Sequence, residues 1–373
     1  MTTVLGRRSL NRATLERQLL LERSPLPVPD AVEHLVGVQA QTPHTWYVGL
    51  WSRLADFDAD AVGALLERRE LVRLALMRST LHLVTPSDLA ALRPWIQPVL
   101  DRDLYRNQLH GKPIADVDVP AVVAAARAAL ADGALTNKQL GDILAPHWPD
   151  TPPGTLVYAV RNQLPLVQVP PRGVWGRSGA IAHTSAEAWL GDAPTPPVDP
   201  ARIIRRYLAA FGPASIRDMQ TWSGLTKLRE VVDPMRPELL TFHDEQGVEL
   251  FDLPDASRPD EATPASPRFL YDFDNALLSF ADRSRIVTEA HTRSFQRRGV
   301  IPQAVLVDGF TAGDWVVERG DDGTATLTIR PLEEPFADAD VAELIEEGSS
   351  LLRFLAPDAP ARRVEIGAPA HPA

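Results

Sequence analysis

The sequence predicts an α+β fold in which a helix-rich unit occurs three times and a strand-rich part follows. Three segments share one order of elements, namely helix, short helix, helix and a pair of strands, which is typical of a winged helix. Beyond a linker rich in Pro, Ala and Ser at 254–267, the residues alternate as they do in strands. We place the units at 8–115, 116–195 and 196–255, and the C-terminal part at 268–355.

The first unit is the longest, and an extra helix precedes its strands. Helices are predicted over 11–22, 30–38 and 44–54, the extra helix over 59–68, and strands around 72–76 and 80–84. Thr85 and Pro86 then begin a further helix, because Pro is favoured at the first helical position.

The second and third units carry clearer start and stop signals. Thr136 with Gln139, and Ser215 with Asp218, have the spacing of a capping box. We predict helices over 120–131, 139–144, 154–164, 200–210, 216–222 and 226–234, and strands over 166–169, 174–177, 239–243 and 248–253. Turns at Arg172-Gly173 and Gln246-Gly247 join the strand pairs.

The C-terminal part alternates as strands over 268–332, with turns at Asp308-Gly309 and Asp322-Gly323. A final helix is predicted over 337–354. The Pro- and Ala-rich tail after it is expected to be frayed.

Composition excludes several classes of protein. The chain has no Cys, so disulfides, thiolate zinc sites and cysteine nucleophiles are excluded. No apolar run is long enough to cross a membrane, and the first twelve residues lack the apolar core of a secretion signal, which predicts a cytoplasmic protein. No phosphate loop, nucleotide-binding glycine pattern or clustered metal ligands occur, so neither a cofactor nor a metal is expected.

The net charge of −11 is unevenly spread. Acidic residues are concentrated in 244–262 and 308–347, whereas arginines cluster in 202–229 and 283–298. A protein of this kind can present a basic face to phosphates while it remains acidic as a whole.

The most unusual segment is Gly37-Val38-Gln39-Ala40-Gln41-Thr42-Pro43. Pro43 disfavours a helical Thr42, so the helix before it should end here. The two glutamine side chains point to one side if the backbone is extended, and to nearly opposite sides if it is helical. Taken alone, polar residues at a helix end more often cap the helix or face solvent than carry chemistry.

Further segments, in order along the chain, extend this pattern into a family resemblance. They are Leu76 to Val84 (LMRSTLHLV), Phe211-Gly212-Pro213-Ala214, Trp222-Ser223-Gly224-Leu225, Phe273-Asp274-Asn275, Ala281 to Arg285 (ADRSR), Val307-Asp308-Gly309 and Gly313-Asp314-Trp315. Together with Gln39 and Gln41 and the helix that follows them, which carries Trp46, Tyr47 and Trp51, these segments resemble the AlkZ/YcaQ-like bacterial DNA glycosylases over about residues 5–355. Glutamine at both positions is similar to the AlkZ branch.

The resemblance implies tandem winged helices in a C-shape around duplex DNA. It also implies a monofunctional glycosylase that excises N7-alkylated guanine and unhooks interstrand crosslinks made by natural products such as azinomycin. Gln39 and Gln41 are then the catalytic residues. The expected partner is double-stranded DNA bound by a monomer. Antibiotic self-resistance is one role such an enzyme can have.

Residues for DNA contact are predicted beside the strands. Arg78, Thr80 and His82 belong to the first strand pair, and Arg177 ends the second. Arg283, Arg285, Arg297 and Arg298 form a basic group, of which Arg297-Arg298-Gly299 could form a hairpin tip. A solvated or packed role is as reasonable for each of them.

The competing function is a winged-helix DNA-binding regulator without enzymatic activity. A regulator usually needs one such unit and an effector domain. Here the units fill most of the chain, which favours a protein that surrounds one site on a duplex.

Overall fold

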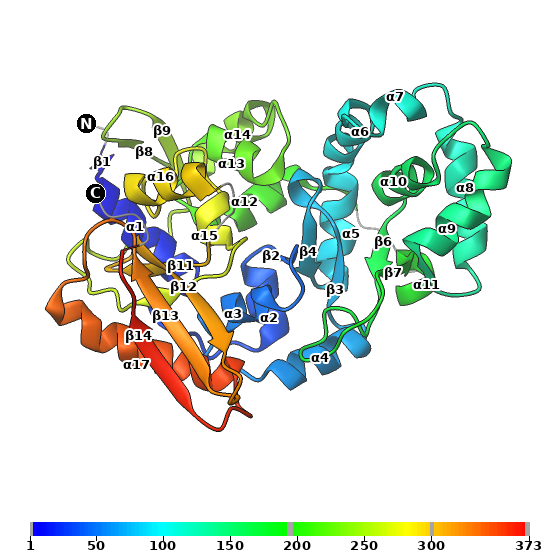
Figure 1. The fold of residues 1–373 in the computed structure, drawn as a ribbon. Helices are drawn as coiled ribbons and strands as arrows, with labels where there is room; N and C mark the ends of the chain where they lie inside the picture. The colour runs from blue at the N-terminus through cyan, green and yellow to red at the C-terminus, as the bar shows by residue number, and fades with distance from the viewer. Residues whose placement is uncertain (1–2, 192–196, 299–301, 370–373) are drawn as a thin grey trace.

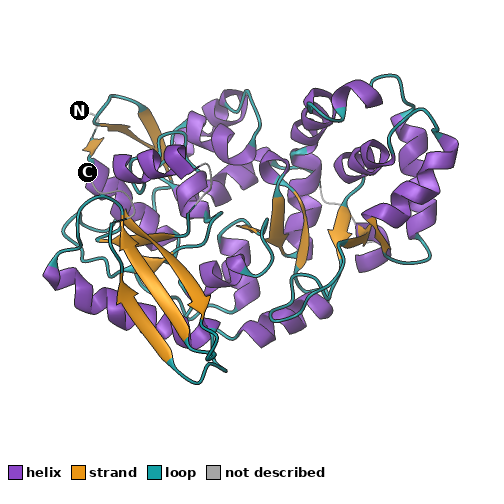
Figure 2. Cartoon of the chain, in the orientation of Figure 1, coloured by secondary structure: helices purple, strands orange, loops and turns teal. Residues whose placement is uncertain are grey.

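Three β-sheets organise the helices in the computed structural model, which describes residues 3–191, 197–298 and 302–369 (Figure 2). The strand orders are β2-β4-β3-β6-β7-β5 in the six-stranded sheet, β10-β11-β12-β13-β14 in the five-stranded sheet and β1-β8-β9 in the three-stranded sheet. The predicted α+β class is confirmed. None of the described helices is long and apolar enough to span a membrane.

The first unit consists of helices followed by a strand pair, with a short strand after its first helix. Its elements are α2 (Val28–His34), β2 (Val38–Gln39), α3 (Thr45–Trp51), α4 (Ala59–Glu67), β3 (Val72–Ala75), the 3-10 turn η1 (Met77–Ser79) and β4 (Leu81–Val84). Strand β4 lies between β2 and β3. The helix predicted as an extra one is therefore the third helix of the unit.

Helix α1 (Arg7–Arg17), which the sequence assigned to the first unit, packs against other parts of the chain. The Arg17 guanidinium forms a buried ion pair with Asp252, whose nitrogen and oxygen atoms lie 2.6 Å apart. The Gln18 side chain donates to the Ala210 carbonyl at 2.6 Å. Both partners belong to the third unit, so α1 fastens that unit to the rest of the molecule.

The second unit repeats the same order. Its elements are α8 (Val119–Leu130), β5 (Leu135–Thr136), α9 (Asn137–Leu144), η2 (Ala145–His147), α10 (Pro153–Gln163), β6 (Leu166–Gln168), β7 (Ala182–Ser185) and α11 (Ala186–Leu190). The predicted capping box of Thr136 and Gln139 is present. Strand β6 pairs with β3, so one sheet crosses from the first unit to the second.

The second strand of this pair was predicted over 174–177 and lies over 182–185 instead. The reason is a long-range contact. Val174 is buried in the core of the first unit, and the Tyr47 hydroxyl donates to the Gly173 carbonyl at 2.9 Å. The segment between β6 and β7 therefore packs on α3 rather than forming a tight hairpin.

Three helices connect the first unit to the second, and the third unit follows the second along the chain. The connecting helices are α5 (Pro86–Trp95), α6 (Gln97–Arg106) and α7 (Gly111–Ile114). The unit consists of α12 (Pro200–Phe211), α13 (Ile216–Ser223), α14 (Arg229–Met235), η3 (Arg236–Glu238), β8 (Leu240–Asp244) and β9 (Glu249–Asp252), and β1 (Val4–Leu5) adds to β8. The predicted capping box of Ser215 and Asp218 is present. In place of a first strand, such as β2 or β5 in the other units, the third unit has a single antiparallel β-bridge between Ala214 and Phe251.

The C-terminal part combines a sheet with three helices. Its elements are β10 (Arg268–Phe269), α15 (Asn275–Leu278), α16 (Glu289–Arg298), β11 (Ala304–Val307), β12 (Phe310–Arg319), β13 (Ala325–Pro331), α17 (Asp338–Leu355) and β14 (Arg362–Ile366). Two expectations were wrong. Helices α15 and α16 interrupt the predicted strands, and 362–366 is no frayed tail but a strand parallel to β13.

The units take separate places in the molecule (Figure 1). The second unit lies at one end, the C-terminal sheet at the other, and the strands of the first unit between them. The same order of elements occurs in each unit, and the first strand of the unit, or the bridge in its place, pairs with its last strand. We interpret each repeat of this order as a winged helix. The proposed domain boundaries and the C-shape around DNA stay predictions.

Candidate active site

Gln39 lies in β2 with only 3% of its surface exposed. Its side-chain oxygen accepts a hydrogen bond from Arg78 Nη2 at 2.6 Å. Its backbone carbonyl accepts from the Tyr271 hydroxyl at 2.8 Å, and its backbone N–H donates to Asn275 Oδ1 at 3.4 Å. Both backbone partners come from the C-terminal part, so this residue is fixed where two regions of the chain meet.

Gln41 is exposed, and its side-chain oxygen accepts from the Leu81 backbone N–H at 3.1 Å. Between the two glutamines, the Ala40 N–H donates to the Leu81 carbonyl at 2.7 Å, and the Ala40 carbonyl accepts from Arg73 Nη2 at 2.7 Å. The pairing with β4 therefore extends by one backbone hydrogen bond beyond Gln39, where β2 ends. The helical conformation considered from sequence does not apply to Gln39, which lies in a strand, and a common orientation of the two side chains stays a prediction.

Gly37 makes this strand possible. Its φ of +91° lies in a region that other residues rarely adopt, and a Cβ there would be only 2.8 Å from Val84 Cγ1. The Asn275 side-chain amide donates to the Gly37 carbonyl at 2.8 Å. The chain can thus turn out of α2 and enter β2 directly.

The orientation of both side-chain amides follows from their partners. A guanidinium and a backbone N–H can only donate, so each must face an amide oxygen. The oxygens of Gln39 and Gln41 are therefore engaged by Arg78 and Leu81. Their Nε2 groups, each with two N–H donors, form the other end of each amide.

Arg78 occupies the turn η1 with a left-handed φ of 55°, and Ser79 after it has a φ of 58°. Besides Gln39, its guanidinium donates to the Trp222 carbonyl at the end of α13. A Cβ at Gly224 would lie 3.3 Å from the Arg78 Cα, so a glycine allows this close approach. Burial lowers the pKa of Arg78 to about 10, and the side chain stays charged at neutral pH.

His82 lies directly opposite Gln39 in the antiparallel pair of β2 and β4. Its side chain is 1% exposed, and Nδ1 lies 3.0 Å from the Thr80 carbonyl. Because a carbonyl only accepts, Nδ1 carries the proton and Nε2 is left as an acceptor. Burial, reinforced by Arg78, lowers the pKa of His82 to about 3. The histidine is therefore neutral, and the expected phosphate contact does not fit a side chain so deeply buried.

The other residues predicted to touch DNA have different surroundings. Thr80 is half-buried and donates to the Met77 carbonyl. Arg285 is buried and donates to the Pro213 carbonyl at 2.8 Å, so it is not available at the surface. Arg177 is exposed but paired with Glu67. Arg283 is exposed beside the cavity between the 281–284 loop and α16.

The expected hairpin tip at Arg297-Arg298-Gly299 is wrong, because both arginines belong to α16. Arg297 is exposed, while the Arg298 side chain and Gly299 lie outside the described residues.

The loop after Gln41 is tied down by residues that the sequence did not single out. The hydroxyls of Thr42 and Thr45 donate to the two carboxylate oxygens of Asp272 at 2.6 and 2.7 Å. His44 Nε2 lies 2.8 Å from the Val174 carbonyl. The signal that could have identified this region is the motif Phe273-Asp274-Asn275. Its aspartate forms a buried ion pair with Arg53 of the first unit.

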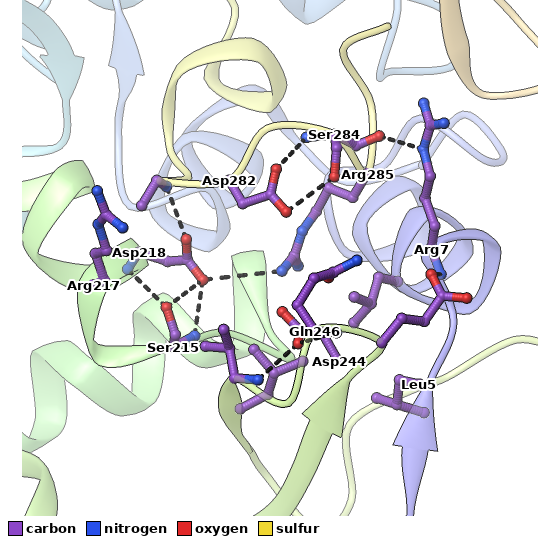
Figure 3. Close-up of a pocket in the computed structure, with 15 residues that line it drawn as sticks. Leu5, Arg7, Ser215, Arg217, Asp218, Asp244, Gln246, Asp282, Ser284 and Arg285 are labelled. Carbon is purple, nitrogen blue, oxygen red and sulfur yellow. Dashed lines mark hydrogen bonds and ion pairs between the residues drawn. The ribbon is translucent and has the colours of Figure 1, made fainter.

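A different pocket, with a volume of about 240 Å³, lies between α1, the β8–β9 turn and the 281–285 loop (Figure 3). Asp218 there accepts from the Ser215 hydroxyl, and Asp282 accepts from the Ser284 hydroxyl. Its polar groups largely pair with one another, and neither glutamine lines it. Among the described residues, no cluster of His, Cys, Asp or Glu could hold a metal ion.

The chain is similar in sequence to known proteins. The sequence model of a family described as "DNA glycosylase AlkZ-like" matches residues 32–354. A Streptomyces sahachiroi protein named "Interstrand DNA cross-link repair glycosylase" is 26% identical over 324 residues, which are 81% of this chain and 85% of that protein.

The fold is also similar to a solved structure, Streptomyces sahachiroi DNA glycosylase AlkZ. The TM-score is 0.72 at 21% identity, and the match covers 98% of this chain and all of the other. The family match spans the glutamine segment, the η1 turn, the end of α13 and α15. The chain therefore belongs to the AlkZ-like DNA glycosylase family and is a DNA glycosylase.

Proposed function

We propose that this enzyme excises N7-alkylated guanine from duplex DNA, including bases held in interstrand crosslinks or bulky natural-product adducts. The observation that carries the proposal is the fixed pair of amides at Gln39 and Gln41. The name of the Streptomyces sahachiroi relative supports crosslinked DNA as a substrate.

The reaction suits a site without a strong acid or base. Alkylation at N7 gives the base a positive charge, so it leaves as a neutral molecule and needs little protonation. Water adds its oxygen to the sugar C1′, the bond from C1′ to N9 breaks, and the electron pair of that bond goes to the base. One proton of the water passes to solvent. The enzyme must then position the water and stabilise a cationic sugar.

The described residues offer complementary hydrogen-bonding groups for this water. The Nε2 groups of Gln39 and Gln41 supply N–H donors, and the amide oxygens can each accept a second hydrogen bond. We assign the two glutamines to holding the water. Lysine is not among these groups, which favours hydrolysis over Schiff-base chemistry.

The test is a base-release measurement on duplex DNA that carries a single N7-methylguanine, and on duplex with a crosslink through guanine N7. We expect free N7-alkylguanine and an abasic strand in the first case, and unhooked strands in the second. Tight DNA binding without release of a base would contradict the proposal and favour a DNA-binding regulator.

A further inference from the structure

An open cavity of about 410 Å³ lies beside Arg78, the residue that donates to Gln39. Three separate parts of the chain line it, namely the η1 turn, helix α6 and the glycine that ends α13. The lining residues are Arg78, Ser79, Val99, Arg102, Asp103, Arg106 and Gly224. It therefore lies where the first unit, the connecting helices and the third unit meet.

The charge of this cavity is positive. Its three arginines face a single carboxylate, Asp103, which accepts hydrogen bonds from the Ser79 hydroxyl at 2.7 Å and from the Tyr158 hydroxyl. A fourth arginine, Arg161, donates to the Ser79 carbonyl at 2.7 Å.

Ion pairing does not neutralise these arginines. Within the ranges that the structure describes, neither Arg161 nor any arginine lining the cavity has a carboxylate oxygen within 4.0 Å. Other arginines of the described chain are ion-paired, as Arg17 is with Asp252 and Arg206 with Asp88. An unneutralised group of this kind attracts an anion.

Donors remain available inside the cavity. The Arg102 guanidinium donates a hydrogen bond to the Gly224 carbonyl at 2.5 Å, which fixes its position and leaves its other N–H groups to donate elsewhere. Arg106 is exposed. A fixed arginine beside a free one is suited to hold the oxygens of a phosphate.

Arg78 connects this cavity to the glutamine pair, because it lines the cavity and also donates to Gln39. We propose that the cavity binds a backbone phosphate of the DNA strand close to the alkylated nucleotide, with Arg102 and Arg106 as its main ligands. The inference rests on the proposed function, since it takes DNA as the occupant. It adds that the cavity holding one phosphate is lined by Arg78, which also orients the amide of Gln39.

The first test measures the affinity for unmodified duplex DNA as a function of salt. For the variant Arg106→Gln, we expect the slope of log K against log salt to decrease by about 0.9, the value for one lost phosphate contact. The matched control is Arg353→Gln, because Arg353 is an exposed arginine on α17, far along the chain and hydrogen-bonded only to the Ser350 hydroxyl among the described residues. Equal slopes for the two variants would overturn the proposal.

The second test locates the phosphate. Single phosphates around an N7-methylguanine are replaced by neutral methylphosphonates, and binding is measured with the wild type and with Arg106→Gln. We expect one position near the lesion to weaken binding to the wild type and to have little further effect on the variant. No such coupled position would contradict a specific phosphate contact.

A third experiment determines whether the ligand of the cavity is a DNA phosphate or free inorganic phosphate. If inorganic phosphate stabilises the protein through Arg106 while the DNA salt slope is unchanged, the cavity takes free phosphate and the proposal is wrong. None of these readouts requires base release. A wild type that fails to excise would therefore contradict the proposed function and leave the phosphate test intact.

Discussion

Arg78 donates a hydrogen bond to the side-chain oxygen of Gln39 at 2.6 Å, although the two residues are 39 positions apart in the chain. The contact depends on the left-handed backbone of the η1 turn. This backbone lets the arginine reach both Gln39 in β2 and the Trp222 carbonyl near the end of α13. In the proposed reaction Arg78 would therefore be a positioning residue. It determines which end of the Gln39 amide is free.

The first prediction concerns that role. Replacing Arg78 by Lys keeps a positive charge but removes the planar fork that reaches both Gln39 and the Trp222 carbonyl. We expect single-turnover excision to slow about 10- to 100-fold. We also expect DNA affinity to fall much less than excision. Equal losses in excision and in affinity would mean that Arg78 only binds DNA.

The second prediction tests the orientation of the amide. Gln39→Glu places a carboxylate against Arg78, so the shape and the contact are kept while the Nε2 donors are lost. If those donors act in the reaction, excision should fall at least as far as in Gln39→Ala. The measurement is single-turnover base release, with folding checked by circular dichroism. A Glu variant as active as the wild type would show that the oxygen is the working end.

The third prediction concerns the pH dependence of excision. With a pKa near 3, His82 does not change charge between pH 5 and 7. We therefore expect the single-turnover rate on N7-methylguanine DNA to be constant over this range. An inflection near pH 6.5, the ordinary value for histidine, would contradict a buried neutral His82.

The fourth prediction concerns stability in acid. In the folded chain the pKa of His82 is lowered to about 3, whereas the unfolded chain takes up a proton near pH 6.5. The unfolded state then binds more protons, so this histidine contributes stability above pH 6.5 that is lost as pH falls toward 3. Its share is up to about 1.4 kcal/mol per pH unit between pH 6.5 and 4.

The variant His82→Asn removes this contribution. Urea unfolding at pH 7 and at pH 5 should show a smaller loss of unfolding free energy on acidification in the variant than in the wild type. His291, whose pKa burial lowers to about 4, acts in the same direction and remains in both proteins. Identical losses would mean that His82 titrates normally.

Local signals explain which parts of the fold could be predicted. Both capping boxes and the helix beginning at Pro86 depend on residues a few positions apart, and each is present. The hairpin around Gly247 is also found within one or two residues of its predicted bounds, because its turn requires a positive φ.

The parts that were missed depend on long-range contacts. Strand β14 forms only because β13 offers a free edge, and the position of β7 depends on Val174 being buried against α3. For the site, the sequence identified Gln39 and Gln41 as a pair. It could not show that His82 and Arg285 are buried, or that Asn275 contacts the backbone of β2.

The fifth prediction addresses the second glutamine alone. Gln41→Asp shortens the side chain and replaces the amide by a carboxylate that can act as a base. We expect it to retain activity on N7-methylguanine, because the Leu81 N–H can still be satisfied by an acceptor oxygen. Base release beside the Gln41→Ala variant measures this. Aspartate no better than alanine would assign the function of Gln41 to its N–H donors.

The central claim is that the two amides carry catalysis while other residues carry DNA affinity. It is tested most directly by single-turnover excision of N7-methylguanine measured beside duplex affinity for Gln39→Ala, Gln41→Ala and the double variant. Each single change should slow excision on the order of 10- to 1000-fold while the Kd changes little. Full excision by the double alanine variant would contradict the account and leave Gln39 and Gln41 as structural residues of an edge strand.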